Sequence, residues 1–177
     1  MPSVSADSTL KFVRQQGFPN ADAAVCSYQF PALMFQPRAI AVAFLAGVVF
    51  QGWAVFVVLS SVLWWNVLLP RLNPFDALYN RMFARRRRIP PLTPATGPRR
   101  FAQAMAATTT LGVGISMLAG WAAAVWAFEA LVTVALASLL LGRLCLGTYL
   151  FHVLRGNFAF ANRTLPWSGP ASTPEPR

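Results

Sequence analysis

Residues 101–142 read FAQAMAATTTLGVGISMLAGWAAAVWAFEALVTVALASLLLG, and Glu129 is the one charged residue among them. Residues 39–70 read AIAVAFLAGVVFQGWAVFVVLSSVLWWNVLLP and contain no charged residue. About 20 apolar residues suffice to cross a bilayer, and a core helix of a soluble protein does not run this long without a charge. The chain is therefore predicted to be an all-α membrane protein.

The overall composition excludes several other classes of protein. Of the 177 residues, 56% are hydrophobic and 11% are charged, whereas roughly 25% of the residues of a soluble domain are charged. A soluble enzyme and a disordered basic protein are both excluded. The N-terminal stretch is mixed and polar rather than basic and then apolar. We therefore expect no cleavable signal peptide and an uncleaved first anchor.

Each apolar run is too long for a single membrane-spanning helix. At about 1.5 Å per residue the runs would extend about 48 Å and about 63 Å, against a hydrocarbon core of roughly 30 Å. Each is interrupted by glycine followed by tryptophan, at Gly52-Trp53 and Gly120-Trp121, as is typical of a tight turn at the membrane surface. The short first span either tilts little, thins the bilayer or forms a re-entrant hairpin. We expect four transmembrane helices in two helical hairpins, at about 38–51, 53–70, 100–119 and 121–143.

The charges predict the orientation of these helices. All 15 lysine and arginine residues lie outside the two hairpin turns, on what becomes one side of the membrane. The positive-inside rule then places both termini and the central segment in the cytoplasm. The sequence is predicted to divide into five segments: a cytoplasmic N-terminal segment (1–37), a first hairpin (38–70), a basic cytoplasmic loop (71–99), a second hairpin (100–156) and a disordered tail (157–177).

The basic loop is predicted to begin with an amphipathic helix on the cytoplasmic face. Asn73 is a good N-cap and Pro74 suits the first helical position. Four arginines follow the helix and are expected to contact anionic lipid headgroups; alternatively, they serve only as a topology signal. Nucleic-acid binding is not expected, because the positive-inside rule already accounts for the charge. The apolar stripe consists of Phe75, Leu78, Tyr79, Met82 and Phe83, and the arginines are Arg85, Arg86, Arg87 and Arg88.

Glu129 is the most unusual residue, because it falls near the middle of the fourth predicted span. Hydroxyl groups at a similar predicted depth are supplied by Ser60, Thr109 and Thr110, which suggests one polar layer. A protonated glutamic acid that holds helices together through these hydroxyls is the favoured interpretation. The alternative is a carboxylate that carries protons or binds a ligand, as the coupling residue of a small transporter.

Cys26, Cys145 and His152 are the remaining candidates for chemistry, and all fall on the predicted cytoplasmic side. A nearby arginine favours the reactive thiolate, but Arg143 lies two residues before Cys145 and would point to nearly the opposite face of a helix. Unless the helix breaks at Gly142 or Gly147, we therefore expect little activation and an inert, partially buried Cys145. His152 is a weak candidate for an axial ligand of a haem or chlorin, since an interfacial histidine is the usual case. Its spacing from the cysteines fits no zinc site, so no metal or cofactor is predicted.

Two short motifs resemble a known family. Residues 98–103, Pro-Arg-Arg-Phe-Ala-Gln, are similar to a Pro-Arg-Phe-Ala-Gln segment, and residues 144–148, Leu-Cys-Leu-Gly-Thr, are similar to a Phe-Cys-Leu-Gly-Cys segment. With the two hairpins and basic loop, they resemble the bacterial domain of unknown function 4395 family over about residues 35–156. The resemblance implies thioredoxin-like or sulfurtransferase partners and thiol or sulfur chemistry. Only Cys145 of its Cys-Leu-Gly-Cys segment is present; Thr148 replaces the second cysteine, so a disulfide within that segment is impossible.

No recognised catalytic motif is present, so we expect a non-catalytic scaffold or accessory subunit of a membrane complex. The small length and short outer turns leave little room for a substrate cavity. A membrane thiol-redox or sulfur-handling protein that uses Cys145, with a thioredoxin-like partner, is the first alternative. A small transporter that uses Glu129 is the second.

Overall fold

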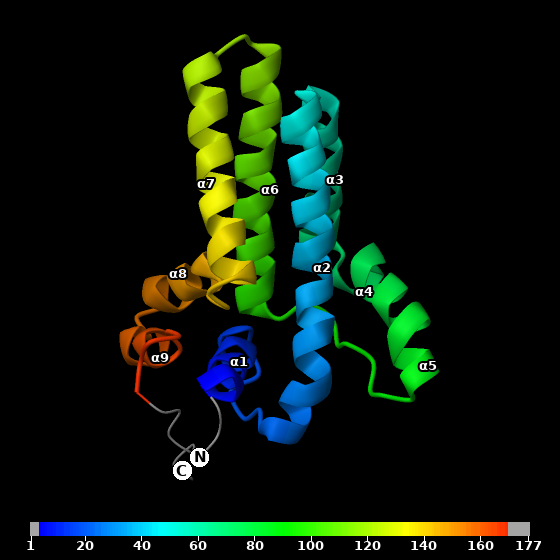
Figure 1. Ribbon diagram of the computed structural model, residues 1–177, viewed down its shortest axis with the longest axis vertical. Helices are drawn as coiled ribbons and strands as arrows, with labels where there is room; N and C mark the ends of the chain where they lie inside the picture. The colour runs from blue at the N-terminus through cyan, green and yellow to red at the C-terminus, as the bar shows by residue number, and fades with distance from the viewer. Residues whose placement is uncertain (1–3, 170–177) are drawn as a thin grey trace.

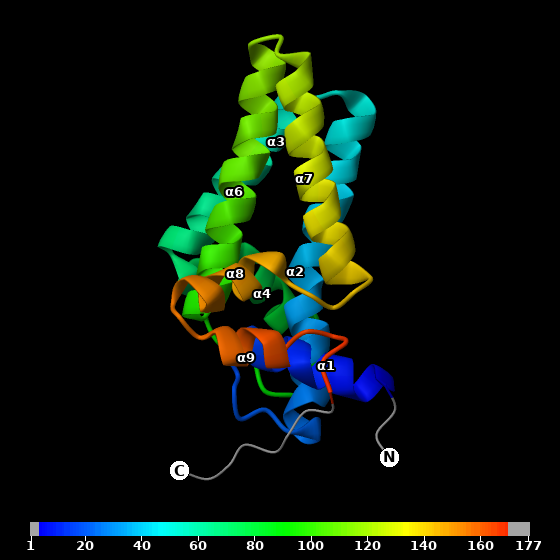
Figure 2. The ribbon, with the colours of Figure 1, turned by 90° about the vertical axis from the view of Figure 1, so that its left-hand side faces the viewer.

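The computed structural model describes residues 4–169, and every regular element in this range is helical (Figures 1 and 2). Short 3-10 and π-helical segments occupy Pro70–Leu72 and Asn80–Ala84. The α-helices are α1 (Val4–Gln15), α2 (Ala23–Phe50), α3 (Trp53–Leu68), α4 (Pro74–Tyr79), α5 (Arg85–Arg87), α6 (Gly97–Leu118), α7 (Ala122–Leu140), α8 (Leu146–Leu154) and α9 (Phe158–Arg163).

Four long helices form a bundle in which α2 contacts α3, α3 contacts α6, α6 contacts α7, and α7 contacts α2. The connections α2–α3 and α6–α7 lie at one end of the bundle, and the shorter helices gather around the other end (Figures 1 and 2). Within the described residues, α2, α6 and α7 are long and apolar enough to cross a membrane, whereas α3 is a shorter apolar helix of 16 residues. The protein is therefore all-helical and membrane-embedded.

Helix α2 begins well before the predicted start at residue 38. Its N-cap is Asp22, whose Oδ1 accepts a hydrogen bond from the backbone N–H of Val25 at 2.8 Å. Pro31 and Pro37 lie inside the helix without ending it, although each removes a backbone hydrogen bond. The first span is predicted at about 38–51, and the helix that contains it begins at Ala23, because tertiary packing overrides the proline signal.

The basal end of the molecule has its own hydrophobic core, formed where α1 packs against α2. Phe12 and Val13 of α1 are fully buried there together with Met34 of α2. Lys11 connects the two ends of the chain, because its Nζ lies 2.8 Å from Oδ2 of Asp7 and donates to the carbonyl oxygen of Ser168 at 2.7 Å. The predicted N-terminal segment is thus a packed part of the fold.

The C-terminal part differs from its prediction in two respects. Helix α7 ends at Leu140, and the chain turns at Arg143, whose φ of 53° is left-handed, so the fourth helix does not reach residue 143. Helix α8 then lies across the base of the bundle (Figure 1). Helix α9 lies within the segment predicted to be disordered, which corrects that prediction up to residue 169; residues 170–177 lie outside the described range.

The amphipathic segment starts where the sequence analysis predicted. Oδ1 of Asn73 accepts hydrogen bonds from the backbone N–H groups of the second and third residues after it, at 3.0 and 3.4 Å. The predicted apolar stripe is divided between two environments: Tyr79 is buried and its ring stacks on Phe83, whereas Leu78 and Met82 are 46% and 45% exposed. The basic run that follows, Arg85 to Arg88, is exposed.

Candidate functional site

A buried ion pair connects α4 and α6 at the base of the bundle. Arg99, in the first turn of α6, donates from Nη1 to Oδ2 of Asp76 at 3.1 Å and from Nη2 to Oδ1 at 2.6 Å. The two residues are only 6% and 7% exposed. A bidentate pair has a defined geometry, and removing either partner would leave a buried charge uncompensated. The pair therefore fixes α4 against α6.

The side-chain amide of Gln36, on α2, joins this pair to a larger network. Its Oε1 accepts hydrogen bonds from Arg99 Nη2 at 2.8 Å, Gln103 Nε2 at 2.9 Å and Asn73 Nδ2 at 3.3 Å. Arg99 and Gln103 lie four residues apart on α6 and so share one face. We call Gln36, Asn73, Asp76, Arg99 and Gln103 the basal network; it ties α2, α4 and α6 together at one level.

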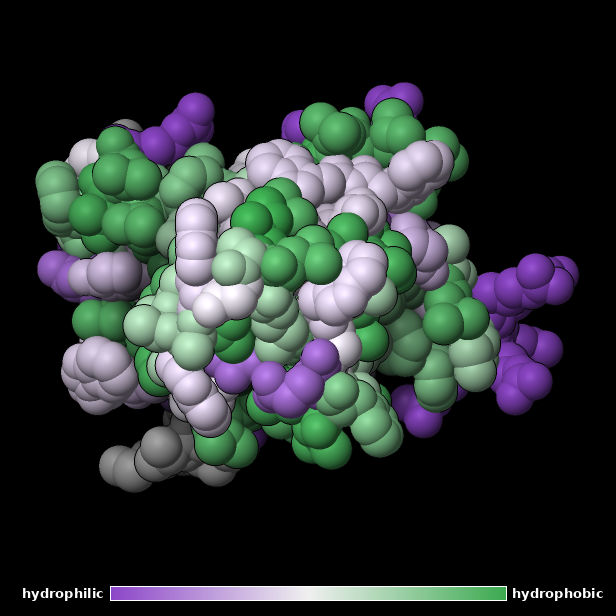
Figure 3. Space-filling model, turned by 90° about the horizontal axis from the view of Figure 1, so that it is seen from above, coloured by the Kyte–Doolittle hydropathy of each residue, from purple (hydrophilic) through white to green (hydrophobic). Residues whose placement is uncertain are grey.

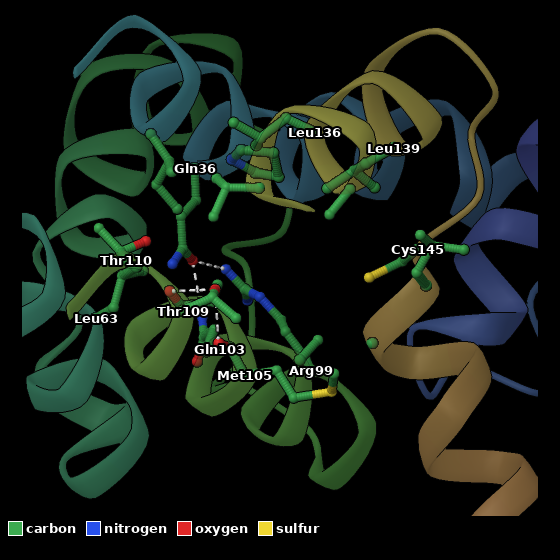
Figure 4. A pocket seen from close by; sticks show the side chains of 18 of the residues that line it. Gln36, Leu63, Arg99, Gln103, Met105, Thr109, Thr110, Leu136, Leu139 and Cys145 are labelled. Carbon is green, nitrogen blue, oxygen red and sulfur yellow. Dashed lines mark hydrogen bonds between the residues drawn. The ribbon is translucent and has the colours of Figure 1, made fainter. Parts of the chain in front are cut away.

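The basal network borders a cavity of about 190 Å³. Gln36, Arg99 and Gln103 converge at one side of it, and Cys145 approaches from the start of α8 (Figure 4). The remaining lining is mainly apolar and comes from several long helices. The sequence predicts little room for a substrate cavity, and this cavity is smaller than the roughly 300–1,000 Å³ typical of ligand pockets. The main apolar lining residues are Leu33, Ile40, Leu63, Leu136 and Leu139.

Two atoms of the basal network lack a partner. Nε2 of Gln36 and Oε1 of Gln103 are buried and make no hydrogen bond within residues 4–169. An unpaired buried polar group is costly, and native structures contain few of them. Within the described residues, the charges of Arg99 and Asp76 are thus paired, whereas Nε2 of Gln36 and Oε1 of Gln103 make no hydrogen bond.

The predicted polar layer around Glu129 is not joined by hydrogen bonds. Glu129 is 5% exposed, and its Oε1 has no partner in the described part of the chain. Thr109 donates to two carbonyl groups of its own helix at 2.9 and 3.1 Å, and Ser60 donates to a carbonyl group of α6 at 2.8 Å. Thr109 and Thr110 line the cavity, whereas Glu129 and Ser60 do not. Threonine hydroxyls often donate to carbonyl groups of their own helix in this way. The predicted depth of a residue in the membrane does not show whether its hydroxyl is engaged in this manner.

Glu129 is therefore expected to be dispensable for folding. We expect Glu129→Leu to raise the free energy of unfolding by about 1 kcal/mol, because it removes an unpaired buried polar atom. Unfolding in mixed detergent and SDS micelles measures this, with the isosteric Glu129→Gln as the control that leaves stability unchanged. A marked loss of stability in the leucine variant would contradict this account. A stable Gln variant that abolished a cellular phenotype would instead indicate proton or ligand binding.

The two cysteines are free and buried, and both belong to the basal hydrophobic core. Cys145 also lines the cavity, and its backbone N–H donates to Oε1 of Gln15 at 3.1 Å. His152 packs between aromatic rings, and its Nε2 lies 3.2 Å from the carbonyl oxygen of Gln15. Gln15 thus holds the start and the middle of α8 against α1. One of the two ring nitrogens of His152, the weak candidate for an axial ligand, is thus engaged with Gln15.

Arg143, the arginine nearest to Cys145 in sequence, contacts residues of α1 and α2. Nη1 of Arg143 donates to the hydroxyls of Ser8 and Thr9 at 2.8 and 2.9 Å, and its guanidinium lies 5.4 Å from the ring centroid of Phe30. These contacts anchor the turn after α7 to α1 and α2. Among the described residues, no group of three or more histidine, cysteine or acidic side chains is arranged to hold a metal ion.

Together these features define a membrane-embedded helical bundle with a polar network and a small cavity at one end. The family model for Domain of unknown function (DUF4395) matches residues 31–155, more than half of the chain, and the chain belongs to this family. The match confirms the resemblance drawn from residues 98–103 and 144–148. No curated protein and no solved structure matches the chain.

The two motifs that carried the resemblance meet in the structure. Helix α8 packs on α6 so closely that a Cβ added to Gly147 would lie 2.7 Å from Cα of Ala102. Arg99 and Gln103 belong to the first motif and Cys145 to the second, and all three line the cavity. The sequence signal for this site was therefore present in the motifs, but Gln36 and Asp76, which complete the network, lay outside them.

Proposed function

We propose that the chain is a non-catalytic, four-span protein of the bacterial inner membrane that serves as a scaffold or accessory subunit of a membrane complex. In this proposal α2 with α3, and α6 with α7, form two hairpins whose turns face the periplasm. The turns contain no basic residue, whereas Arg99, Arg100 and Arg143 lie at the opposite helix ends. That distribution supports cytoplasmic termini.

The apolar surface of the bundle supports a role in helix contacts. Seen from above, onto the end of the bundle with the two turns, apolar and weakly polar residues dominate; hydrophilic side chains project at the edge and form one small patch nearer the middle (Figure 3). Helix α7 buries 17% of its apolar segment, against 33% for α2 and for α6. Its exposed face carries Trp126, which is 71% exposed, and two exposed alanines four residues apart, Ala123 and Ala127. Small residues at this spacing favour close approach of a second transmembrane helix.

The loosely packed face of α7 is the observation that carries the accessory-subunit proposal, and it can be tested directly. We expect a photo-crosslinking amino acid at Val134, which is 58% exposed, to form a discrete adduct with another membrane polypeptide in native membranes. The same amino acid at Val132, 6% exposed and two residues away, is the control and should form none. Adducts with lipid alone at Val134 would refute the proposal that α7 contacts a partner.

In the same proposal, the exposed arginines Arg85 to Arg88 help to hold their segment on the membrane surface. Arg85 to Arg88 follow a helix whose exposed apolar residues, Leu78 and Met82, lie in its middle part. Apolar side chains that enter the headgroup region and arginines beside anionic headgroups are a common way to hold a segment on a membrane. We propose that this segment rests on the cytoplasmic leaflet.

A thiol-based function is the second candidate, because Cys145 lines the cavity. Cys145 is 9% exposed and Cys26 is 7% exposed, and reactive cysteines are as a rule accessible. We therefore expect slow alkylation of Cys145 in membranes near neutral pH, and no disulfide with Cys26 or a partner thiol. Alkylation rates measured against pH, with Cys145→Ser and Cys26→Ser as controls, check this. Rapid modification below pH 8, or a crosslink to a thioredoxin-like protein lost in Cys145→Ser, would favour the thiol function.

A further inference from the structure

The cavity lies where α6 and α7 separate. Near their turn the two helices are in close contact, because a Cβ added to Gly112 would lie 2.9 Å from Cζ of Phe128. Toward the base the helices diverge, and α8 crosses beneath them (Figure 2). Residues on both helices below this contact line the cavity, and the start of α8 lines it at the base: Met105 and Thr109 on α6, Leu131 and Ala135 on α7, and Leu146 and Gly147 on α8.

The cavity extends along the helices for about the depth of one layer of lipid chains. Its lining residues on α7 run from Leu131 to Leu139. At about 1.5 Å per residue, these two residues lie about 16 Å and about 28 Å along the helix from Gly120. On α6, Thr109 and Ala102 line the cavity at about the same distances from the turn. A hydrocarbon core of roughly 30 Å contains two layers of chains, so the cavity spans the layer on the basal side.

The cavity is open to the surroundings of the bundle along this length. Met105, Leu131 and Leu146 line it and are also 37%, 51% and 37% exposed. They belong to α6, to α7 and to the start of α8, so the opening runs from the middle of the spans to their base. Because α6 and α7 are apolar enough to cross a membrane, the molecules that reach an opening at this depth are lipid acyl chains.

The polar groups that border the cavity do not require a polar ligand. The guanidinium of Arg99 is paired with Asp76, and the hydroxyl of Thr109 donates to carbonyl groups of its own helix. The unpaired amide atoms of Gln36 and Gln103 are themselves buried and are not reached from the cavity. An apolar chain therefore matches the accessible lining.

We propose that one acyl chain of a phospholipid in the basal leaflet occupies this cavity. Its carboxyl end lies beside the start of α8, and its terminal methyl group lies near Thr109 and Leu131. At about 190 Å³ the cavity has room for part of one chain, and the glycerol and head group remain outside. The chain supplies dispersion contacts to α7, of whose apolar segment 17% is buried. It thus packs as a wedge between α6 and α7.

Photolabelling of the purified full-length chain in phospholipid nanodiscs tests this proposal. The probes are two phospholipids with the same head group, which carry a diazirine either next to the carboxyl group or at the methyl end of one acyl chain. We expect the first to label Leu139 and the second to label Leu131 and Ala135, each more strongly than Val134, which is 58% exposed outside the cavity. Stronger labelling of Val134 than of Ala135 would overturn the proposal, because lipid would then only surround the bundle.

A matched pair of variants on α7 locates the chain. Ala135 lines the cavity, whereas Ala137 is exposed on the other side of the helix. Ala135→Phe should lower the labelling of Leu131 and Leu139 about tenfold, because the blocked chain loses the burial of at least two methylene groups. Ala137→Phe should leave that labelling unchanged. Equal labelling of the two variants would refute the cavity as the site.

Native mass spectrometry of the unaltered chain decides the question even if Ala135→Phe does not fold. We expect the chain extracted from its membranes to retain one phospholipid. Retention of a different apolar molecule, or of none, would contradict the proposal. The proposal rests on α6 and α7 crossing the membrane, and labelling of Trp121→Cys from one side of the membrane tests that separately.

Discussion

Arg99→Met is expected to lower the free energy of unfolding by about 3–5 kcal/mol, because it leaves the carboxylate of Asp76 buried without its partner. The substitution also removes one of the three hydrogen bonds to Oε1 of Gln36. Unfolding in mixed detergent and SDS micelles provides the measurement. A loss of this size would show that the basal network holds α4 against α6.

Two further variants make the interpretation specific. Arg100 is adjacent but exposed, so Arg100→Met should have an effect below about 1 kcal/mol. Combining Arg99→Met with Asp76→Leu should recover much of the lost stability, because an apolar pair can replace a buried ion pair. If Arg99→Met and Arg100→Met were equally stable, the buried pair would have no structural importance.

Gly147→Ala is expected to lower the stability by about 1–3 kcal/mol, because the added methyl group has no space between α8 and α6. It would lie 2.7 Å from Cα of Ala102, and backbone cannot move aside as a flexible side chain can. Gly97→Ala is the matched control at the same pair of helices, since its methyl group would meet the ring of Phe151 at an ordinary 3.6 Å. Equal stability of the two variants would show that α8 does not pack closely on α6.

The sequence predicted the long helices well, because they follow from hydropathy and turn residues. Helix α2 ends at Phe50 and α3 begins at Trp53, next to the expected break at Gly52. Gly120, with φ of 71°, lies between α6 and α7 as its turn position predicts. The early start of α2 was not predictable from proline rules, since the packing of α1 stabilises residues that are unfavourable for a helix.

The basal network was not predictable from local patterns. Gln36 and Arg99 are separated by 63 residues and meet only because α2 and α6 belong to one bundle. The sequence analysis used Arg99 only as one of the basic residues that predict orientation in the membrane, whereas in the structure its guanidinium also forms a buried ion pair with Asp76. Glu129 was a candidate because an acidic residue in an apolar run is rare. The cavity is lined instead by residues of the two family motifs and not by Glu129. An unusual residue type in one segment of the sequence does not show which side chains lie close together in the folded chain.

We propose that four helices cross the membrane, with the two turns on one side and the basic end of the bundle on the other. In a cysteine-free background, Gly52→Cys and Trp121→Cys place thiols at the two turns, and Arg86→Cys places one at the basic end; Trp121 is chosen because it is 63% exposed beside Gly120. With a membrane-impermeant maleimide, we expect intact cells to be labelled at both turns, and Arg86→Cys to be labelled only after permeabilisation. Labelling of Gly52→Cys only after permeabilisation would contradict the account, because α2 and α3 would then not cross the membrane as a hairpin.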